Sequence, residues 1–192
     1  MRRNVLVLKR VLVLVFFGAA ILLTGQGSGV ITSSLNHVCA YPRYLNGDPN
    51  YIILYGKMGT AWYLDISSVN SLIYNPPFYK LSARVVGAVS AIGDERDFYI
   101  NNGEGRIFKE IDYILTYNWN SRESRFSKGG NFQIVYPVGS EARTSIEKQV
   151  SEMVFAVAYN MKFFGDRQWP NPDEHNKLTT AFEDKFYEGI LH

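Results

Sequence analysis

The chain has 192 residues, with 20 Lys and Arg against 18 Asp and Glu, three histidines and a single cysteine. Because histidine and cysteine are so scarce, we expect no His-based catalytic triad, no metal site of such ligands and no cofactor. The near balance of charge also excludes a nucleic-acid partner, because phosphate backbones are held by strongly basic surfaces.

Residues 1–40 have the composition of an export signal. Four basic residues precede an apolar run over residues 11–23, and no acidic residue occurs before position 41. The 13-residue run is shorter than the roughly 20 residues of a membrane-spanning helix, which favours a signal peptide over a permanent anchor. Cleavage after Ala40 and cleavage near Gly27 or Gly29 both stay open.

Removal of residues 1–40 would leave 16 basic and 18 acidic residues, a net charge of −2. It would also remove Cys39, so the mature chain would contain no disulfide. About 150 residues are enough for one hydrophobic core without such a bond.

Alternation of apolar and polar residues from position 51 to 136 predicts six or seven mostly antiparallel strands. Residues 51–55, apolar on both faces, predict a central strand, and residues 56–59 a turn. In the next strand Trp62, Leu64 and Ile66 share the core face, because successive side chains alternate across a strand. Further strands are expected over residues 79–89, 98–100, 111–119 and 132–136.

The periodicity changes after Pro137 to that of a helix, with apolar residues every three or four positions. Ser140 suits the start of this helix and Gly165 its end. Val157 lies in its apolar second half, which predicts burial. The pattern therefore predicts an α+β fold: an antiparallel β-sheet of about six strands packed on a C-terminal α-helix, within an exported domain over residues 41–165.

Residues 166–192 are expected to form a C-terminal tail. Two prolines interrupt its first part, and Leu178, Phe182 and Phe186 have the spacing of a possible short helix. Such a helix would either dock on the domain or fray.

Two residues are weak candidates for binding. Tyr63 lies on the face opposite Trp62, where an aromatic ring would suit a sugar or peptide platform, although aromatic residues of a small β-rich domain are more often core and cross-strand pairs, the interpretation that we favour. Asp65 precedes two serines, so its carboxylate either caps the local backbone at the end of a strand or contacts a ligand. We expect Trp62, Asp65, Val157 and Gly165 to be structural, and we expect no catalytic residue.

The acidic cluster Asp94, Glu95 and Asp97 matches no calcium-loop spacing. We interpret it as a solvated loop. The stretch "NNGEG" lacks the lysine of a phosphate-binding loop, so it predicts a turn.

A series of short motifs carries a family resemblance: "YPRY" (41–44), "MGTAWYLDISS" (58–68), "YNPPFY" (74–79), "DFY" (97–99) and "FAVAYNMKFFG" (155–165). In this order they resemble small uncharacterised exported proteins of bacteria, and more distantly the surface-adhesin protein E type of domain. The resemblance implies export to the periplasm or cell surface. The resemblance assigns no functional residue to this chain.

Three functions are compatible with these features. The first is a non-enzymatic envelope or surface domain that binds an unknown partner or has a structural role, with membrane contact only through an uncleaved signal segment. The second is a small-ligand or peptide carrier, which requires a pocket of roughly 300 Å³ or more. The third is a carboxylate-based enzyme acting on polysaccharide, which requires two carboxyl groups about 5–10 Å apart across a cleft.

Overall fold

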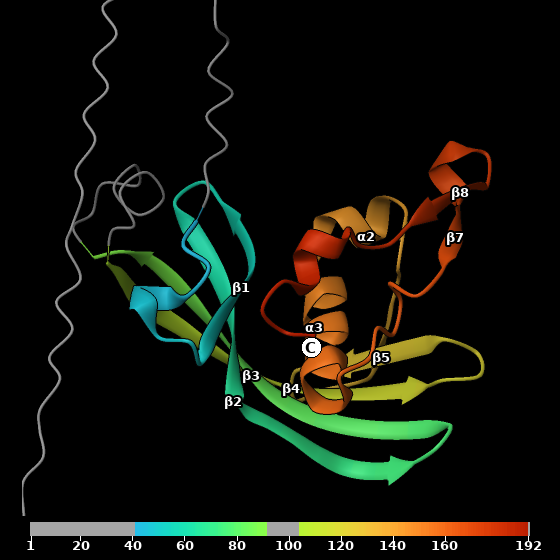
Figure 1. Cartoon of the computed structure of the whole chain (residues 1–192), viewed down its shortest axis with the longest axis horizontal. Coiled ribbons are helices and arrows are strands. Elements are labelled where there is room, and N and C mark those ends of the chain that lie inside the picture. Colours follow the sequence, from blue (N-terminus) through green and yellow to red (C-terminus); the bar gives the residue numbers. More distant parts are fainter. Residues whose placement is uncertain (1–40, 92–103, 192) are drawn as a thin grey trace, which may run out of the picture. The chain divides into compact units, whose positions relative to one another are not determined.

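The structure is a computed structural model that describes residues 41–91 and 104–191. Its main element is a six-stranded antiparallel sheet with the strands in chain order. The strands are β1 (Tyr51–Lys57), β2 (Thr60–Asn75), β3 (Phe78–Ser90), β4 (Gly105–Asn118), β5 (Glu123–Ser127) and β6 (Gln133–Val135). Figure 1 shows this sheet curving around helix α3 (Glu147–Tyr159). The predicted α+β class, with about six antiparallel strands on one main helix, is therefore confirmed.

The main core lies between the concave face of the sheet and α3. Val150, Met153, Val154 and Phe155 of the helix are buried against the sheet. Leu64, Leu81, Val85, Tyr113, Leu115 and Tyr117 are the sheet residues that meet them. Each fully buried side chain of this kind contributes about 1.5–3 kcal/mol relative to exposure, so this contact dominates the stability of the domain.

A second, smaller cluster covers part of the opposite sheet face. Tyr63 and Val86 pack there beneath Leu45 of the 3₁₀ turn η1 (Leu45–Gly47). This cover explains why β1 is apolar on both faces although it lies at the edge of the sheet. The expectation that residues 51–55 form a central strand is therefore wrong.

The predicted single helix is wrong in its bounds. A short helix α2 (Ser140–Thr144) comes first, and α3 begins after an extended Ser145 whose Oγ accepts a hydrogen bond from the Glu147 N–H at 3.1 Å. The helix ends at Tyr159 because Asn160 adopts a left-handed conformation, with φ 53°. This end comes before Gly165, and the tail follows, so α3 is the last α-helix of the described chain but does not reach the C-terminal end.

Residues 166–191 pack onto the domain. They form a two-stranded sheet, β7 (Gln168–Asn171) with β8 (Lys177–Thr180), and two 3₁₀ turns, η2 (Pro172–Glu174) and η3 (Asp184–Tyr187). Leu178 lies in β8, whereas Phe182 and Phe186 pack against the main core. The region expected to form a short helix instead forms a β-hairpin strand followed by a 3₁₀ turn. The expected strand at 98–100 and the acidic cluster at 94–97 lie outside the described residues.

Candidate functional site

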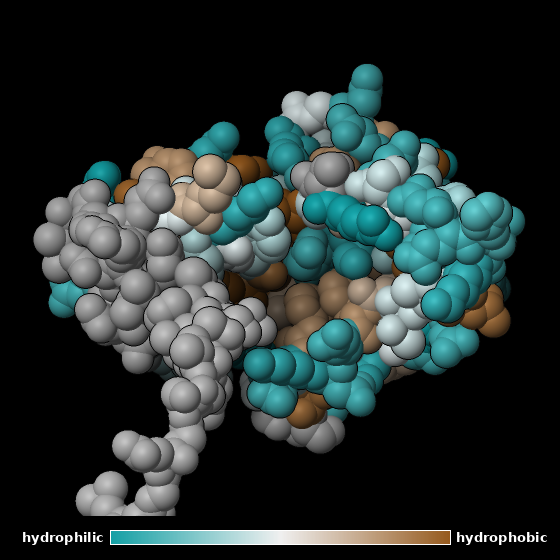
Figure 2. Space-filling view, turned by 90° about the horizontal axis from the view of Figure 1, so that it is seen from above, coloured by the Kyte–Doolittle hydropathy of each residue, from teal (hydrophilic) through white to brown (hydrophobic). Residues whose placement is uncertain are grey.

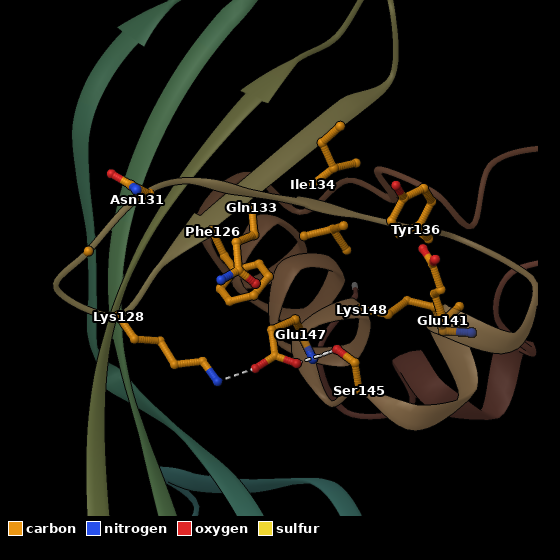
Figure 3. A pocket seen from close by; sticks show the side chains of 13 residues that line it. Phe126, Lys128, Asn131, Gln133, Ile134, Tyr136, Glu141, Ser145, Glu147 and Lys148 are labelled. Atoms are coloured by element: carbon orange, nitrogen blue, oxygen red, sulfur yellow. Dashed lines mark hydrogen bonds and ion pairs between the residues drawn. The ribbon is translucent and has the colours of Figure 1, made fainter.

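A pocket of about 480 Å³ opens between the β5–β6 hairpin and the start of α3 (Figure 3). We call it the hairpin pocket. Apolar walls are supplied by Phe126, Ile134, Val135 and Tyr136. Charged residues enter from the loop after β5 and from the two helices: Lys128, Glu141, Glu147 and Lys148. The mixture of apolar walls and a few charged groups is typical of a binding pocket.

Glu147 has a hydrogen-bonding or ion-pair partner on each of its two carboxylate oxygens. Its side chain is nearly buried, and Lys128 Nζ lies 2.5 Å from its Oε1. The hydroxyl of Tyr113 donates to the same oxygen at 3.1 Å, and the hydroxyl of Ser145 donates to Oε2. Figure 3 shows Lys128 and Ser145 on opposite sides of the carboxylate. Every strong partner of Glu147 therefore stabilises its ionised form.

The pKa of Glu147 follows from this geometry. Burial alone raises it, but the hydrogen bonds from Lys128 and Ser145 and the charge of Lys128 outweigh burial and hold the pKa below its ordinary value. Burial, and then the charge of Glu147, raise the pKa of Tyr113. At neutral pH Glu147 is thus an ionised carboxylate paired with Lys128, and the phenol of Tyr113 beside it stays protonated.

Strand β6 leaves one side of its backbone open next to this pocket. It pairs with β5 on one side, and within the described residues no backbone hydrogen bond reaches its other side. Phe132, Ile134 and Tyr136 are 41%, 42% and 47% exposed along it. An open edge with exposed apolar side chains is a template for pairing with another strand.

Asp65 has the local capping role. Its Oδ1 accepts hydrogen bonds from the Ser67 N–H at 3.1 Å and from the Ser67 hydroxyl at 2.6 Å. Ser68 Oγ donates to the Asp65 carbonyl at 2.6 Å and accepts from the Arg84 N–H at 2.7 Å. The capped segment is a bulge inside β2, since pairing with β3 shifts between Asp65 and Asn70. The expectation that the strand ends there is wrong.

Tyr63 lies where it cannot reach a ligand on the surface. Its side chain has 0% exposure, and its hydroxyl donates to the Pro42 carbonyl at 3.3 Å. Burial raises the pKa of this phenol. The structure therefore gives no support to Tyr63 as a binding residue.

The expected structural residues are near the core. Trp62 packs at the margin of the main cluster and meets Phe108 edge to face at 5.9 Å, and Val157 is also partly buried there. Gly165 does not end the helix; a Cβ at this position would lie 1.8 Å from the Tyr187 hydroxyl. The glycine is thus required by close packing with the tail.

Sequence reasoning missed the most buried acid, Glu152 of α3. It has 0% exposure and accepts hydrogen bonds from the N–H groups of Phe163, Phe164 and Gly165 at 2.7–3.2 Å, and from the Tyr187 hydroxyl at 2.6 Å. Burial raises its pKa, although all four hydrogen bonds oppose that shift. A charged residue inside an apolar helical run was the available signal.

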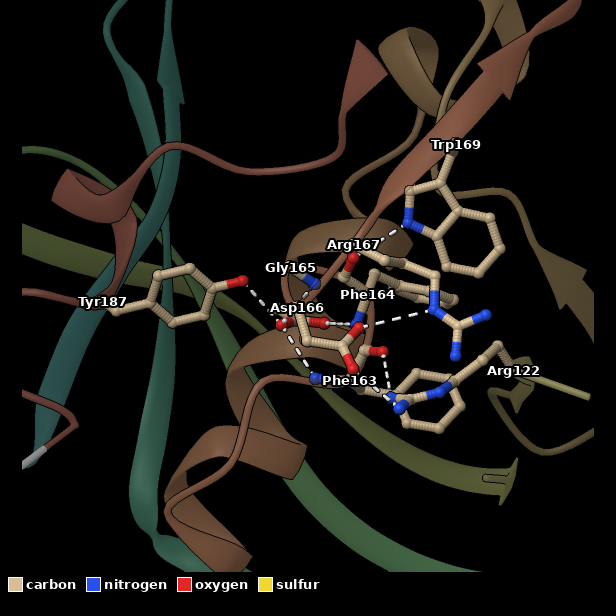
Figure 4. Close-up of polar contacts among 9 residues, drawn as sticks. Arg122, Phe163, Phe164, Gly165, Asp166, Arg167, Trp169 and Tyr187 are labelled. Carbon is tan, nitrogen blue, oxygen red and sulfur yellow. Dashed lines mark hydrogen bonds and ion pairs between the residues drawn. The ribbon is translucent and has the colours of Figure 1, made fainter. Parts of the chain in front are cut away.

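Arg122 holds the same loop from the other side. It donates to the Phe163 carbonyl at 2.8 Å and to Asp166 at 2.7 Å, and its guanidinium lies 3.5 Å from the centre of the Trp119 ring. Figure 4 shows Tyr187 approaching the loop from one side and Arg122 lying on the other. This network fixes the chain after α3, although the buried Nε of Arg122 has no hydrogen-bond partner within the described residues.

Comparisons with protein-family models, with curated proteins and with solved structures find no match to this chain. Within residues 41–91 and 104–191, no group of three or more His, Cys, Asp or Glu residues is placed to hold a metal ion. None of the helices in those ranges has the length and apolar character that a membrane span requires.

Proposed function

We propose that this chain is an exported, non-enzymatic binding protein of the cell envelope, and that it holds an extended peptide segment of an envelope partner along β6. The observation that carries the proposal is the hairpin pocket of about 480 Å³, lined by the strand whose outer edge is open. Main-chain hydrogen bonds to the edge supply affinity in such complexes, and a pocket for an alternate side chain supplies specificity.

The charges of the hairpin pocket support binding rather than catalysis. Lys128 and Glu147 neutralise each other at 2.5 Å, and the Lys148 ammonium donates to the Ala181 carbonyl at 3.0 Å. The lowered pKa of Glu147 makes its carboxylate a weak base, and its ion pair with Lys128 suits it to positioning a polar group of a ligand. The apolar walls beside them suit a peptide side chain with an apolar stem and a polar tip.

The proposed location follows from the N-terminal segment. Basic residues ahead of the apolar run 11–23 favour export, and the resemblance to small exported bacterial proteins agrees with it. A small-ligand carrier would use the same pocket volume. The open edge of β6 favours an extended peptide over a small ligand, because a peptide backbone can form main-chain hydrogen bonds with that edge.

Site-specific crosslinking in the native envelope tests this proposal. A photoreactive residue at position 134 should capture one partner segment, whereas the same group at Ile107, which is 37% exposed on β4, should not. A synthetic peptide of the captured segment should then bind the purified chain and slow hydrogen exchange of the β6 amides.

The variant Ile134→Lys should weaken that peptide at least tenfold, because a charge at an open edge discourages strand pairing. Ile107→Lys is the matched control and should bind as the wild type does. Equal capture from both positions, or exchange protection that leaves β6 unchanged, would refute the proposed site.

A further inference from the structure

Two further pockets adjoin each other near the C-terminal segment. The larger, of about 770 Å³, lies between residues 41–44 and the tail, and we call it the basic pocket. The smaller, of about 440 Å³, lies beside α3, and we call it the apolar pocket. Tyr44 and Gly189 border both. A Cβ at position 189 would lie 3.1 Å from the Tyr44 hydroxyl, so Gly189 and Tyr44 pack closely where the two pockets meet.

The apolar pocket has hydrocarbon walls. Its lining includes Ile52 and Ile66 of the sheet, Ala156 and Val157 of α3, and Ile190 of the tail. Among its lining residues, only Tyr44 and Asn160 carry polar side-chain atoms. Such a cavity favours an apolar chain over a polar ligand. Figure 2 shows one face of the molecule, on which hydrophobic residues lie in a hollow with many hydrophilic residues around it.

The basic pocket contains cations that no carboxylate neutralises by an ion pair within the described part of the chain. Arg43 donates to the backbone carbonyl of Glu188, and Lys148 donates to that of Ala181 at 3.0 Å while lying 4.7 Å over the Phe182 ring. Lys185 is a third cation in the lining. The acidic side chains of the lining, Glu183 and Glu188, are exposed to solvent.

Lys148 is the most buried of these cations. Burial lowers its pKa, and the negative charge of Glu152 only partly offsets this effect, so the ammonium charge is incompletely stabilised. An ammonium has three donors, and within the described residues it has one acceptor, the Ala181 carbonyl. An anion beside Lys148 would satisfy this unused capacity.

We infer that the two pockets together bind a single-chain anionic amphiphile of the fatty-acid type, with its alkyl chain in the apolar pocket and its carboxylate against Arg43, Lys148 and Lys185. The site stands apart from the proposed peptide site, although Lys148 borders both. The sequence offers no sign of it, since its walls come from residues 41–66, from α3 and from the tail.

Calorimetric titration of the purified full chain with octanoate, decanoate and dodecanoate, below the concentrations at which they form micelles, tests the site. We expect one ligand per chain and roughly tenfold tighter binding for each two added methylene groups. Dodecyltrimethylammonium, with the same chain and the opposite charge, should bind at least tenfold more weakly. Equal binding of both head groups, or affinity independent of chain length, would overturn the inference.

Variants separate the two halves of the site. Arg43→Gln and Lys185→Gln should each weaken dodecanoate several-fold, whereas Lys177→Gln, an exposed lysine on β8, should leave binding unchanged. Val157→Phe should fill part of the apolar pocket and reduce the affinity for dodecanoate more than that for octanoate. If this variant does not fold, the chain-length series still decides the question. The inference would also be refuted if the chain co-sedimented with phosphatidylglycerol vesicles but did not bind monomeric dodecanoate.

Discussion

Removal of the Glu152 carboxylate should cost more stability than any other single change to a charged side chain in the described part of the chain. Glu152→Ala leaves three backbone N–H groups and the Tyr187 hydroxyl without their acceptor, and all of these donors except the Gly165 N–H are buried. Each buried donor without a partner costs about 1–3 kcal/mol, so the three buried donors give at least about 3 kcal/mol. That is a large fraction of the roughly 5–15 kcal/mol by which domains are stable.

Tyr187→Phe provides the graded comparison. It removes one of the four hydrogen bonds and leaves the three backbone donors satisfied, so it should cost about 1.5–3 kcal/mol. Chemical denaturation with fluorescence detection measures both losses. Hydrogen exchange should show faster exchange at residues 163–165 in Glu152→Ala, because these N–H groups have lost their acceptor.

The control for both variants is Glu183→Ala, an exposed acid of the tail, which should change the free energy of unfolding by less than about 0.5 kcal/mol. The reasoning fails if Glu152→Ala unfolds within about 1 kcal/mol of the wild type. Such a result would mean that water or another group satisfies the four donors as well as the carboxylate does.

Three further predictions concern single positions. Asp65→Ala should lower the free energy of unfolding by about 1 kcal/mol, as loss of a capping residue does, and Asp65→Asn should restore most of it. The lowered pKa of Glu147 means that the unfolded chain binds its proton more readily, so wild-type stability should fall as the pH drops below about 4.5. In Glu147→Gln this part of the pH dependence, followed by thermal melting at several pH values, should disappear. Gly165→Ala should destabilise the domain by about 1–3 kcal/mol, seen in the denaturation midpoint, because its Cβ would overlap the Tyr187 hydroxyl.

Local periodicity was sufficient to predict the central part of the sheet. In β4, Tyr113, Leu115 and Tyr117 are all buried on one face, and in β3 Leu81, Ala83 and Val85 are buried in the same core. Strands of this kind have one apolar face, so the sequence pattern and the structure carry the same information.

The position of β1 at the edge of the sheet could not be predicted from the residues of β1 alone. Its second apolar face is covered by a separate cluster that includes Leu45 and Tyr63, so a strand at the edge has the pattern of a central one. The end of α3 was missed for a related reason. Phe163 and Phe164 continue the apolar run of the sequence and are buried, but they lie in the loop after the left-handed Asn160 and not in the helix.

The candidate sites were beyond sequence reasoning because long-range contacts build them. The Lys128–Glu147 pair joins the loop after β5 to α3. The basic pocket joins residues 41–44 to the tail. No rule of residue spacing connects positions so far apart in the chain. The local signal was an acidic residue within an apolar run, as at Glu152.

The buried carboxylate and the basic pocket are linked through the tail. Glu152 holds Tyr187, and the residues on either side of Tyr187, Phe186 and Glu188, line the basic pocket. Any change that releases Tyr187 from α3 should therefore also displace that wall of the pocket. Conversely, a ligand that binds only the docked tail stabilises docking by about 2.7 kcal/mol at one hundred times its Kd. The N–H groups of residues 163–165 exchange only when their contacts with Glu152 open. Dodecanoate should therefore slow their hydrogen exchange, although the proposed site does not touch these groups.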